Sequence, residues 1–254
     1  MKRINIFIVV LIVSLIIFSN LFASVSLASP DLGDIGIILD ENGDRETTVD
    51  TVRLFIVITI LTLAPSFLIL TTCFTRIIVV LSFLRNAMGT QQSPPNQLLI
   101  GLALFLTFFI MRPVYTDIMD NAVTPFLEEE ISRDEAMQRG SDPLKAFMLK
   151  ETREKDIALF LRASGSDNVA EPMDLPITTV IPAFAISELR TAFSMGFLLF
   201  LPFLVIDMVV ASILMSMGMM MLPPVMISLP FKILLFVLAD GWHVVIKSLV
   251  ESFI

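Results

Sequence analysis

Four long apolar blocks make up much of this chain and limit the folds open to it. They cover residues 54–71, 98–111, 192–215 and 225–250. A helix needs roughly 20 predominantly apolar residues to cross a bilayer, and these blocks reach or approach that length. A hydrophobic content of 56% and a mean hydropathy of +0.85 exclude an ordinary soluble domain. The sequence therefore predicts an all-α, membrane-associated protein built from helical hairpins.

The second apolar block is shorter than the others. Its 14 residues, 98–111, are followed by Arg112 and Pro113, and as a helix they would be about 21 Å long. That length is short for a bilayer span and more typical of a helix buried in protein. We therefore expect some of the apolar blocks to pack against protein instead of lipid.

The N-terminus has the layout of a secretion signal. Two basic residues precede an apolar stretch, residues 4–18, and in the small-residue tract that follows Ser26 and Ala28 fit the −3 and −1 positions of a cleavage site. We predict a signal peptide over residues 1–28, with an uncleaved first helix as the alternative. Residues 29–51 are rich in acidic side chains and glycine and are expected to form a flexible exported leader.

The rest of the chain divides into three segments. Residues 52–115 are expected to form a first hydrophobic hairpin, whose connection carries Arg76 and Arg85 and no acidic residue. Basic residues mark the cytoplasmic side of a membrane protein, so we place this connection inside. Residues 116–190 then form a polar helical region on the outer, periplasmic side. Residues 191–254 form a second hydrophobic hairpin whose tip faces the cytoplasm.

Within the polar region the sequence favours one helix with a clear start. Asp142 can cap its first turn and Pro143 suits the first helical position, with apolar residues at helical spacing as far as Arg162. Pro176 and Pro182 disfavour helix in the chain that follows. We expect a small helical cap and then non-helical chain.

The tip of the second hairpin is unusually rich in methionine. The run 215–224 has five methionines in its first seven residues and ends in two prolines, which prevent an uninterrupted helix. Methionine is unbranched and polarizable, so a cluster of it forms an apolar surface that can repack around different shapes. Met219, Met220 and Met221 are therefore candidates for a deformable gasket in a passage. A buried apolar turn is the alternative.

Two charged residues lie inside the apolar blocks that flank this tip. Asp207 is in the middle of the third block and Lys232 in the fourth, at similar distances in sequence from the tip. A charge inside an apolar segment is costly and tends to face a partner or a cavity. We expect an ion pair, within one hairpin or between neighbouring copies. Two charges that reach an aqueous cavity separately and a proton relay are the alternatives.

The residue patterns of catalysis are missing from the sequence. His243 has no serine or cysteine motif near it, Cys73 is the single cysteine, and the acidic run 128–130 is typical of a solvated surface. The sequence has neither a phosphate-binding Gly-rich loop nor a cluster with metal-ligand spacing. A net charge of −8 argues against nucleic-acid binding. The sequence therefore predicts a protein that is not an enzyme and needs no cofactor or metal.

Several segments together resemble the FliP family of flagellar type III export-gate proteins, whose virulence-secretion relatives share the pattern. The resemblance covers roughly residues 50 to 250. Its segments are FTRIIVVLSFLRNAMGT (74–90), QQSPPNQ (91–97), LLIGLALFLTFF (98–109), FLVIDMVVAS (203–212) and the methionine tip.

This resemblance implies an assembly rather than a single working chain. Family members assemble in several copies with the small membrane proteins FliQ and FliR into a helical, cone-like complex in the bacterial inner membrane at the flagellar basal body. Its central channel passes unfolded flagellar subunits, and much of it lies above the bilayer plane, on the periplasmic side. Met219, Met220 and Met221 match the methionine loop around the closed pore, and Asp207 and Lys232 match charged positions expected to bridge subunits. A self-contained transporter or channel, with Asp207 binding a coupling ion, is the alternative.

Overall fold

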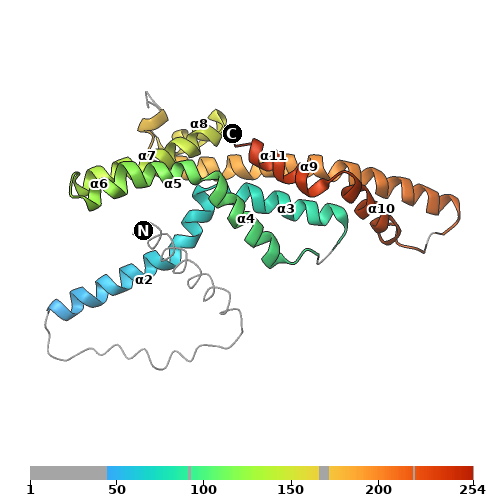
Figure 1. Cartoon of the computed structure of the whole chain (residues 1–254), viewed down its shortest axis with the longest axis horizontal. Helices are drawn as coiled ribbons and strands as arrows, with labels where there is room; N and C mark the ends of the chain where they lie inside the picture. Colours follow the sequence, from blue (N-terminus) through green and yellow to red (C-terminus); the bar gives the residue numbers. More distant parts are fainter. Residues whose placement is uncertain (1–44, 91–92, 166–171, 220, 254) are drawn as a thin grey trace, which may run out of the picture. The chain divides into compact units, whose positions relative to one another are not determined.

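The computed structural model of the chain describes residues 45–90, 93–165, 172–219 and 221–253 (Figure 1). The chain divides into two units, residues 1–54 and 55–254, and the sites discussed below lie in the second. All regular secondary structure in the described ranges is helical, which confirms the all-α prediction. The predicted signal peptide lies outside the described residues, as does the predicted leader up to residue 44.

The helix α2 (Arg45–Thr71) begins inside the predicted leader. Residues 45–51 are therefore helical, and the helix starts well before the apolar block at residue 54. From Phe55 to Leu70 its side chains are exposed, with the half-buried Pro65 as the exception. Thr72 and Cys73 follow, and the chain bends by 71° into the next helix.

The helix α9 (Ile177–Ser216) is 40 residues long, and it packs mainly against the helices of residues 74–88, 133–151, 154–164 and 224–238. The expectation that Pro182 would keep this part of the chain out of a helix is wrong, because both Pro182 and Pro202 lie within α9. Each proline removes one backbone hydrogen bond. The tightly packed side chains beside Pro182, among them Val180 and Phe184, hold the helix there.

The closest neighbour of α9 is α3 (Phe74–Met88), which lies alongside it (Figure 1). Gly196 permits the close approach of the two helices, because a Cβ atom at this position would lie 2.6 Å from the ring of Phe83. The main hydrophobic core lies around α3. Its fully buried side chains include Ile77, Val80, Leu81, Leu84, Leu99, Ala192 and Leu249.

The arms of the first hairpin differ from those expected from the apolar blocks. The helix α4 (Asn96–Ile110) packs against α3, so the connection that carries Arg76 and Arg85 is itself a helical arm. The second hairpin pairs α9 with α10 (Pro224–Leu238), and residues 217–223 join them. Because α9 starts at Ile177, the expected boundary at residues 190 and 191 falls inside a continuous helix.

Three of the apolar segments are broken by bends. Besides the bend after α2, α4 meets the helical segment of residues 112–127, which begins with α5 (Arg112–Ile118), at 55°. The helix α10 meets α11 (Gly241–Glu251) at 63°. Pro113, which follows the short second block, lies in the first turn of α5. In the described residues, α9 is the one helix that is long and apolar enough to cross a membrane by itself. If each bent pair of helices counts as one span, up to four segments could cross it.

The polar region is helical, but its helices differ from the one expected. After the π-helical turn η2 (Met119–Val123) and the short α6 (Thr124–Leu127), α7 (Arg133–Glu151) and α8 (Glu154–Ser164) follow. Ser132, rather than Asp142, caps α7 by accepting a hydrogen bond from the backbone N–H of Glu135. Pro143 lies inside α7, and this helix ends at Glu151, before the extended residue Thr152. The short turn η3 (Pro172–Asp174) precedes α9.

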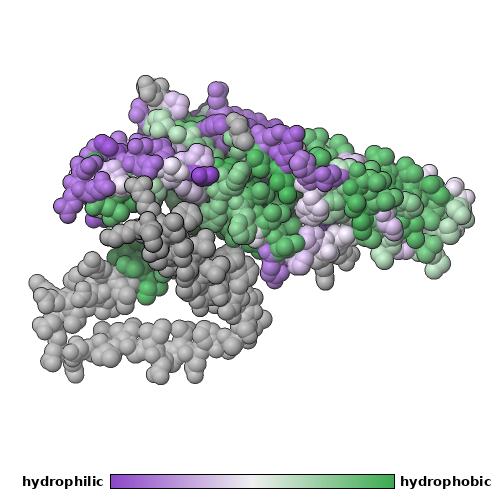
Figure 2. All heavy atoms as spheres, in the orientation of Figure 1, coloured by the Kyte–Doolittle hydropathy of each residue, from purple (hydrophilic) through white to green (hydrophobic). Residues whose placement is uncertain are grey.

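The surface of the second unit changes character along α9. Figure 2 shows hydrophilic side chains over α6 and α7, and hydrophobic ones over α10 and the adjacent end of α9. Exposed apolar side chains there include Phe197, Leu198, Val205, Met208, Ile213, Met226, Phe231 and Leu234. Large exposed apolar patches mark protein or membrane contacts. This end of the unit is therefore built for an apolar environment.

Candidate functional site

The methionine tip is a structured turn rather than a loose loop. The helix α9 ends at Ser216, and Gly218 adopts a left-handed conformation with φ of 74°. The backbone N–H of Gly218 donates to the carbonyl of Met215 (3.1 Å) and that of Met219 to the carbonyl of Leu214 (3.0 Å). This pair of bonds is the Schellman motif, which needs a residue at positive φ and so favours glycine. Gly218 therefore fixes the direction in which the tip leaves α9.

The tip presents methionine side chains outward. Met221 is 98% exposed, and Met215 and Met217 are also exposed, whereas Met219 is half-buried. Met220 lies outside the described residues. Pro223 precedes α10 and Pro224 occupies its first turn, so the second helix starts immediately after the tip. The described residues leave the side chain of Met221 uncovered, as expected for a surface that meets a partner.

Asp207 and Lys232 lie together in one chain. The ammonium Nζ of Lys232 is 2.6 Å from Oδ2 of Asp207, and Lys232 is only 2% exposed. The sequence left open whether the pair forms within one hairpin or between neighbouring copies, and in the structure it forms within one hairpin. A bridge between subunits stays a prediction from the family resemblance.

Two further groups complete this buried ion pair. Ser228 Oγ donates to Oδ1 of Asp207, and Lys232 Nζ also donates to the backbone carbonyl of Ala87 at the end of α3 (3.2 Å). Sequence reasoning missed both. Ser228 carried a usable signal, because it precedes Lys232 by one helical turn and so shares its face of α10. The carbonyl of Ala87 carried none, because only the packing of α3 beside α10 brings it near.

A second buried ion cluster surrounds Arg76 at the other end of α3. Its guanidinium donates through Nε to Glu188 of α9 (2.9 Å) and pairs through a terminal nitrogen with Glu151 of α7 (2.8 Å). The other terminal nitrogen donates to the backbone carbonyl (3.2 Å) and the hydroxyl (3.1 Å) of Ser252, and the ring of Phe253 lies 3.8 Å from the guanidinium carbon. One arginine therefore joins α3, α7, α9 and the chain after α11.

This cluster corrects one step of the topology argument. Arg76 was used to assign this connection to the cytoplasmic side, yet it is 2% exposed and its partner Glu188 is fully buried. A buried arginine is placed by its ion-pair partners, so it carries no information about the cytoplasmic side. The charge argument for sidedness then rests on Arg85, which is half-buried and bonded to Asn96.

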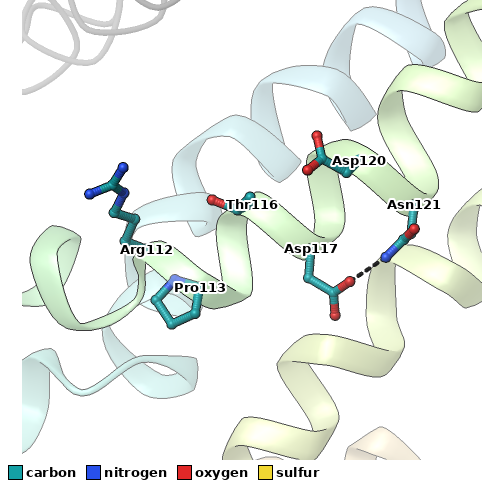
Figure 3. Close-up of a pocket in the computed structure, with 6 residues that line it drawn as sticks. All are labelled: Arg112, Pro113, Thr116, Asp117, Asp120 and Asn121. Atoms are coloured by element: carbon teal, nitrogen blue, oxygen red, sulfur yellow. Dashed lines mark hydrogen bonds between the residues drawn. The ribbon is translucent and has the colours of Figure 1, made fainter.

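A surface hollow of the described structure does not provide a catalytic constellation. It has a volume of about 500 Å³ and lies on the exposed face of α5 and η2 (Figure 3). Its lining residues are Arg112, Pro113, Thr116, Asp117, Asp120 and Asn121. In Figure 3 the side chain of Arg112 points away from the two aspartates, and the carboxylate of Asp117 accepts a hydrogen bond from the side-chain amide of Asn121. The hollow is open to solvent and contains no histidine, cysteine or serine.

The other residues weighed for chemistry are scattered. Cys73 is completely buried at the bend between α2 and α3, whereas His243 is exposed on α11. The acidic run of residues 128–130 lies in the exposed turn after α6. Within the described ranges, no three histidine, cysteine or acidic side chains are grouped so that they could hold a metal ion.

The sequence matches known proteins over most of its length. A profile of the FliP family matches residues 57–249. The chain is 59% identical over 212 residues to the flagellar biosynthetic protein FliP of Bacillus subtilis (strain 168), which covers 84% of this chain and 96% of that protein. It is 55% identical over 207 residues to the FliP protein of Aquifex aeolicus (strain VF5), with 81% and 87% covered. For the FliP protein of Pectobacterium carotovorum the identity is 51% over 212 residues, with 84% and 82% covered.

Proposed function

Because this chain belongs to the FliP family, we propose that copies of it assemble with FliQ and FliR into the channel that passes unfolded flagellar subunits across the bacterial inner membrane. Membership makes it a component of the flagellar export apparatus and not an enzyme. The observation that carries the channel proposal is the methionine tip, an outward-facing apolar turn at the end of a helical hairpin with a buried ion pair between its arms.

The tip has the properties that a seal around a moving polypeptide requires. A threading chain changes in width with every side chain, so the seal must yield without admitting ions. Unbranched thioethers adapt their shape better than branched side chains do. In the proposed channel, Met219, Met220 and Met221 of several copies form a gasket around the closed pore. The exposure of Met221, which none of the described residues covers, supports that role.

The apolar surface of α9 and α10 supports an assembly with other membrane proteins. A lone subunit would leave these side chains to lipid, whereas copies of the chain and FliQ and FliR would cover part of them. Bridging between subunits by Asp207 and Lys232 would add to the pair that each chain already contains. The bent segments fit a complex whose helices lie partly above the bilayer, since none needs to span it straight.

The proposed location is the inner membrane at the flagellar basal body, with the polar region, residues 116–190, on the periplasmic side. Its hydrophilic surface over α6 and α7 fits an aqueous compartment (Figure 2). The alternative of an ion-coupled transporter has less support. Both carboxylate oxygens of Asp207 already accept hydrogen bonds from groups of the same chain, Ser228 and Lys232, so a coupling ion would have to share the carboxylate with the Lys232 ammonium.

Native mass spectrometry of the affinity-purified protein in detergent tests this proposal. We expect a particle that contains several copies of this chain together with FliQ and FliR. A functional transporter that purifies as one protein species, without FliQ and FliR, would reject the proposed channel assembly. Cells that lack FliR provide the control, because the mixed particle should then be absent while the chain is still made.

A further inference from the structure

We propose that Ser228 positions the methionine tip, as part of a three-helix clamp that also contains Asp207, Lys232 and the backbone carbonyl of Ala87. This inference rests on the proposed function, because it explains how the tip is held in the closed state. The clamp, defined by these four groups, joins α9 and α10 through side chains and α3 through a backbone carbonyl, and its Ser228 and Lys232 are buried.

The carbonyl end of α3 is a suitable partner for Lys232. The last four carbonyls of a helix accept no hydrogen bond from an N–H group of the same helix, and the negative end of the helix dipole lies there. Ala87 is the penultimate residue of α3, and Gly89 ends the helix in a left-handed conformation with φ of 78°. Lys232 therefore binds both a carboxylate of α9 and the negative end of α3. A shift of α10 would break both interactions.

Ser228 controls the second oxygen of the same carboxylate. The serine is fully buried, and its hydroxyl donates to Oδ1 of Asp207 while Lys232 binds Oδ2. The hydroxyl also lies 3.1 Å from the carbonyl oxygen of Val225, but it has one proton, and the charged carboxylate is the stronger acceptor. With both oxygens held from one face of α10, the carboxylate has a fixed orientation toward Lys232.

The clamp lies close to the tip on both arms of the hairpin. Ser228 is one turn into α10, and Asp207 is separated from the end of α9 by nine residues, about 14 Å of helix. Because helices are stiff over such lengths, the orientation of α10 at the clamp sets the position of Met221. Ser228 therefore acts on the seal through Asp207, without touching the passage itself.

Substitution of Ser228 by alanine in the complete export complex tests this inference. The ion pair of Asp207 and Lys232 stays, so we expect recovery of the complex near that of the unmodified protein. Loss of a hydrogen bond to a charged group should shift the equilibrium between the closed and open states toward the open state, about tenfold or more. The measurement is the fraction of time that the complex conducts ions in a planar lipid bilayer without substrate.

Ser82→Ala is the matched control, because the hydroxyl of Ser82 in α3 donates only to the carbonyl of Ile78 in its own helix (2.7 Å). An unchanged conducting fraction in Ser228→Ala, beside a leaking variant of the methionine tip, overturns the positioning role. If the methionine variant does not leak either, the proposed seal itself fails. If Ser228→Ala assembles poorly, Ser228→Cys, a weak donor of similar size, decides: a raised conducting fraction supports the role and an unchanged one rejects it.

Discussion

Replacement of Arg76 by methionine should destabilise the protein by about 3–5 kcal/mol. Methionine has a similar length and removes the charge. Glu188, which is fully buried, would then lose the guanidinium that binds both of its oxygens. Glu151 and Ser252 would lose their partner as well. An uncompensated carboxylate in the interior is far more costly than the loss of a surface pair.

The melting temperature of the purified complex in detergent measures this effect. A loss of 3–5 kcal/mol corresponds to a fall of roughly 6–20 °C for a chain of this size. Arg139→Met is the control, because Arg139 pairs with Glu135 on the exposed surface of α7, where a pair contributes about 1 kcal/mol or less. Equal melting temperatures for the two variants would show that the Arg76 cluster does not stabilise the interior. The double variant Arg76→Met, Glu188→Met should recover part of the loss.

Replacement of Asp207 by alanine should sharply reduce the amount of intact complex. Lys232 would keep its charge in a site that is 2% exposed, with the carbonyl of Ala87 as its remaining partner. Breaking a buried pair on one side costs roughly 3–5 kcal/mol, and Ser228 would also lose the acceptor of its hydrogen bond. Since the pair joins α9 to α10, its loss should loosen the hairpin that the proposed assembly packs together.

Recovery of the complex from detergent, relative to the amount of chain in the membrane, measures this loss. Glu251→Ala is the control, because Glu251 and Lys247 are both exposed and 3.8 Å apart. Normal recovery of the Asp207 variant would contradict a structural role for the pair. Substitution of Asp207 by asparagine should have an intermediate effect, since the amide has one oxygen, which can still accept a hydrogen bond from Ser228 or Lys232, while its NH2 group replaces the other acceptor.

The contrast between the two ion clusters shows what sequence alone can reveal here. Asp207 and Lys232 are conspicuous because each interrupts an apolar block, and the tip between them places both at a similar height. Glu151 and Glu188 lie 75 and 112 residues after Arg76 in the sequence, and both are in segments that contain other charged residues. Nothing in the local sequence pairs them. Their meeting depends on the packing of α7 and α3 against α9.

The boundaries of the helices show a similar limit. Hydropathy located the apolar segments and the all-α class, and the family resemblance that followed is confirmed by the match over residues 57–249. Hydropathy did not show that the chain between the first two apolar blocks forms the helix α3, which packs in the core. Proline rules also failed at Pro182, because side-chain packing along α9 outweighs the loss of one hydrogen bond.

The proposed gasket is tested most directly by the ion conductance of the complete complex with Met219, Met220 and Met221 all replaced by alanine. Alanine removes the long thioethers and keeps the backbone of the turn, so the closed pore should conduct ions without substrate. A triple alanine variant at exposed methionines of the polar region is the control, and it should stay closed. Its positions are Met119, Met137 and Met173. Conductance equal to that of the unmodified complex, in a tip variant that assembles normally, would contradict the account.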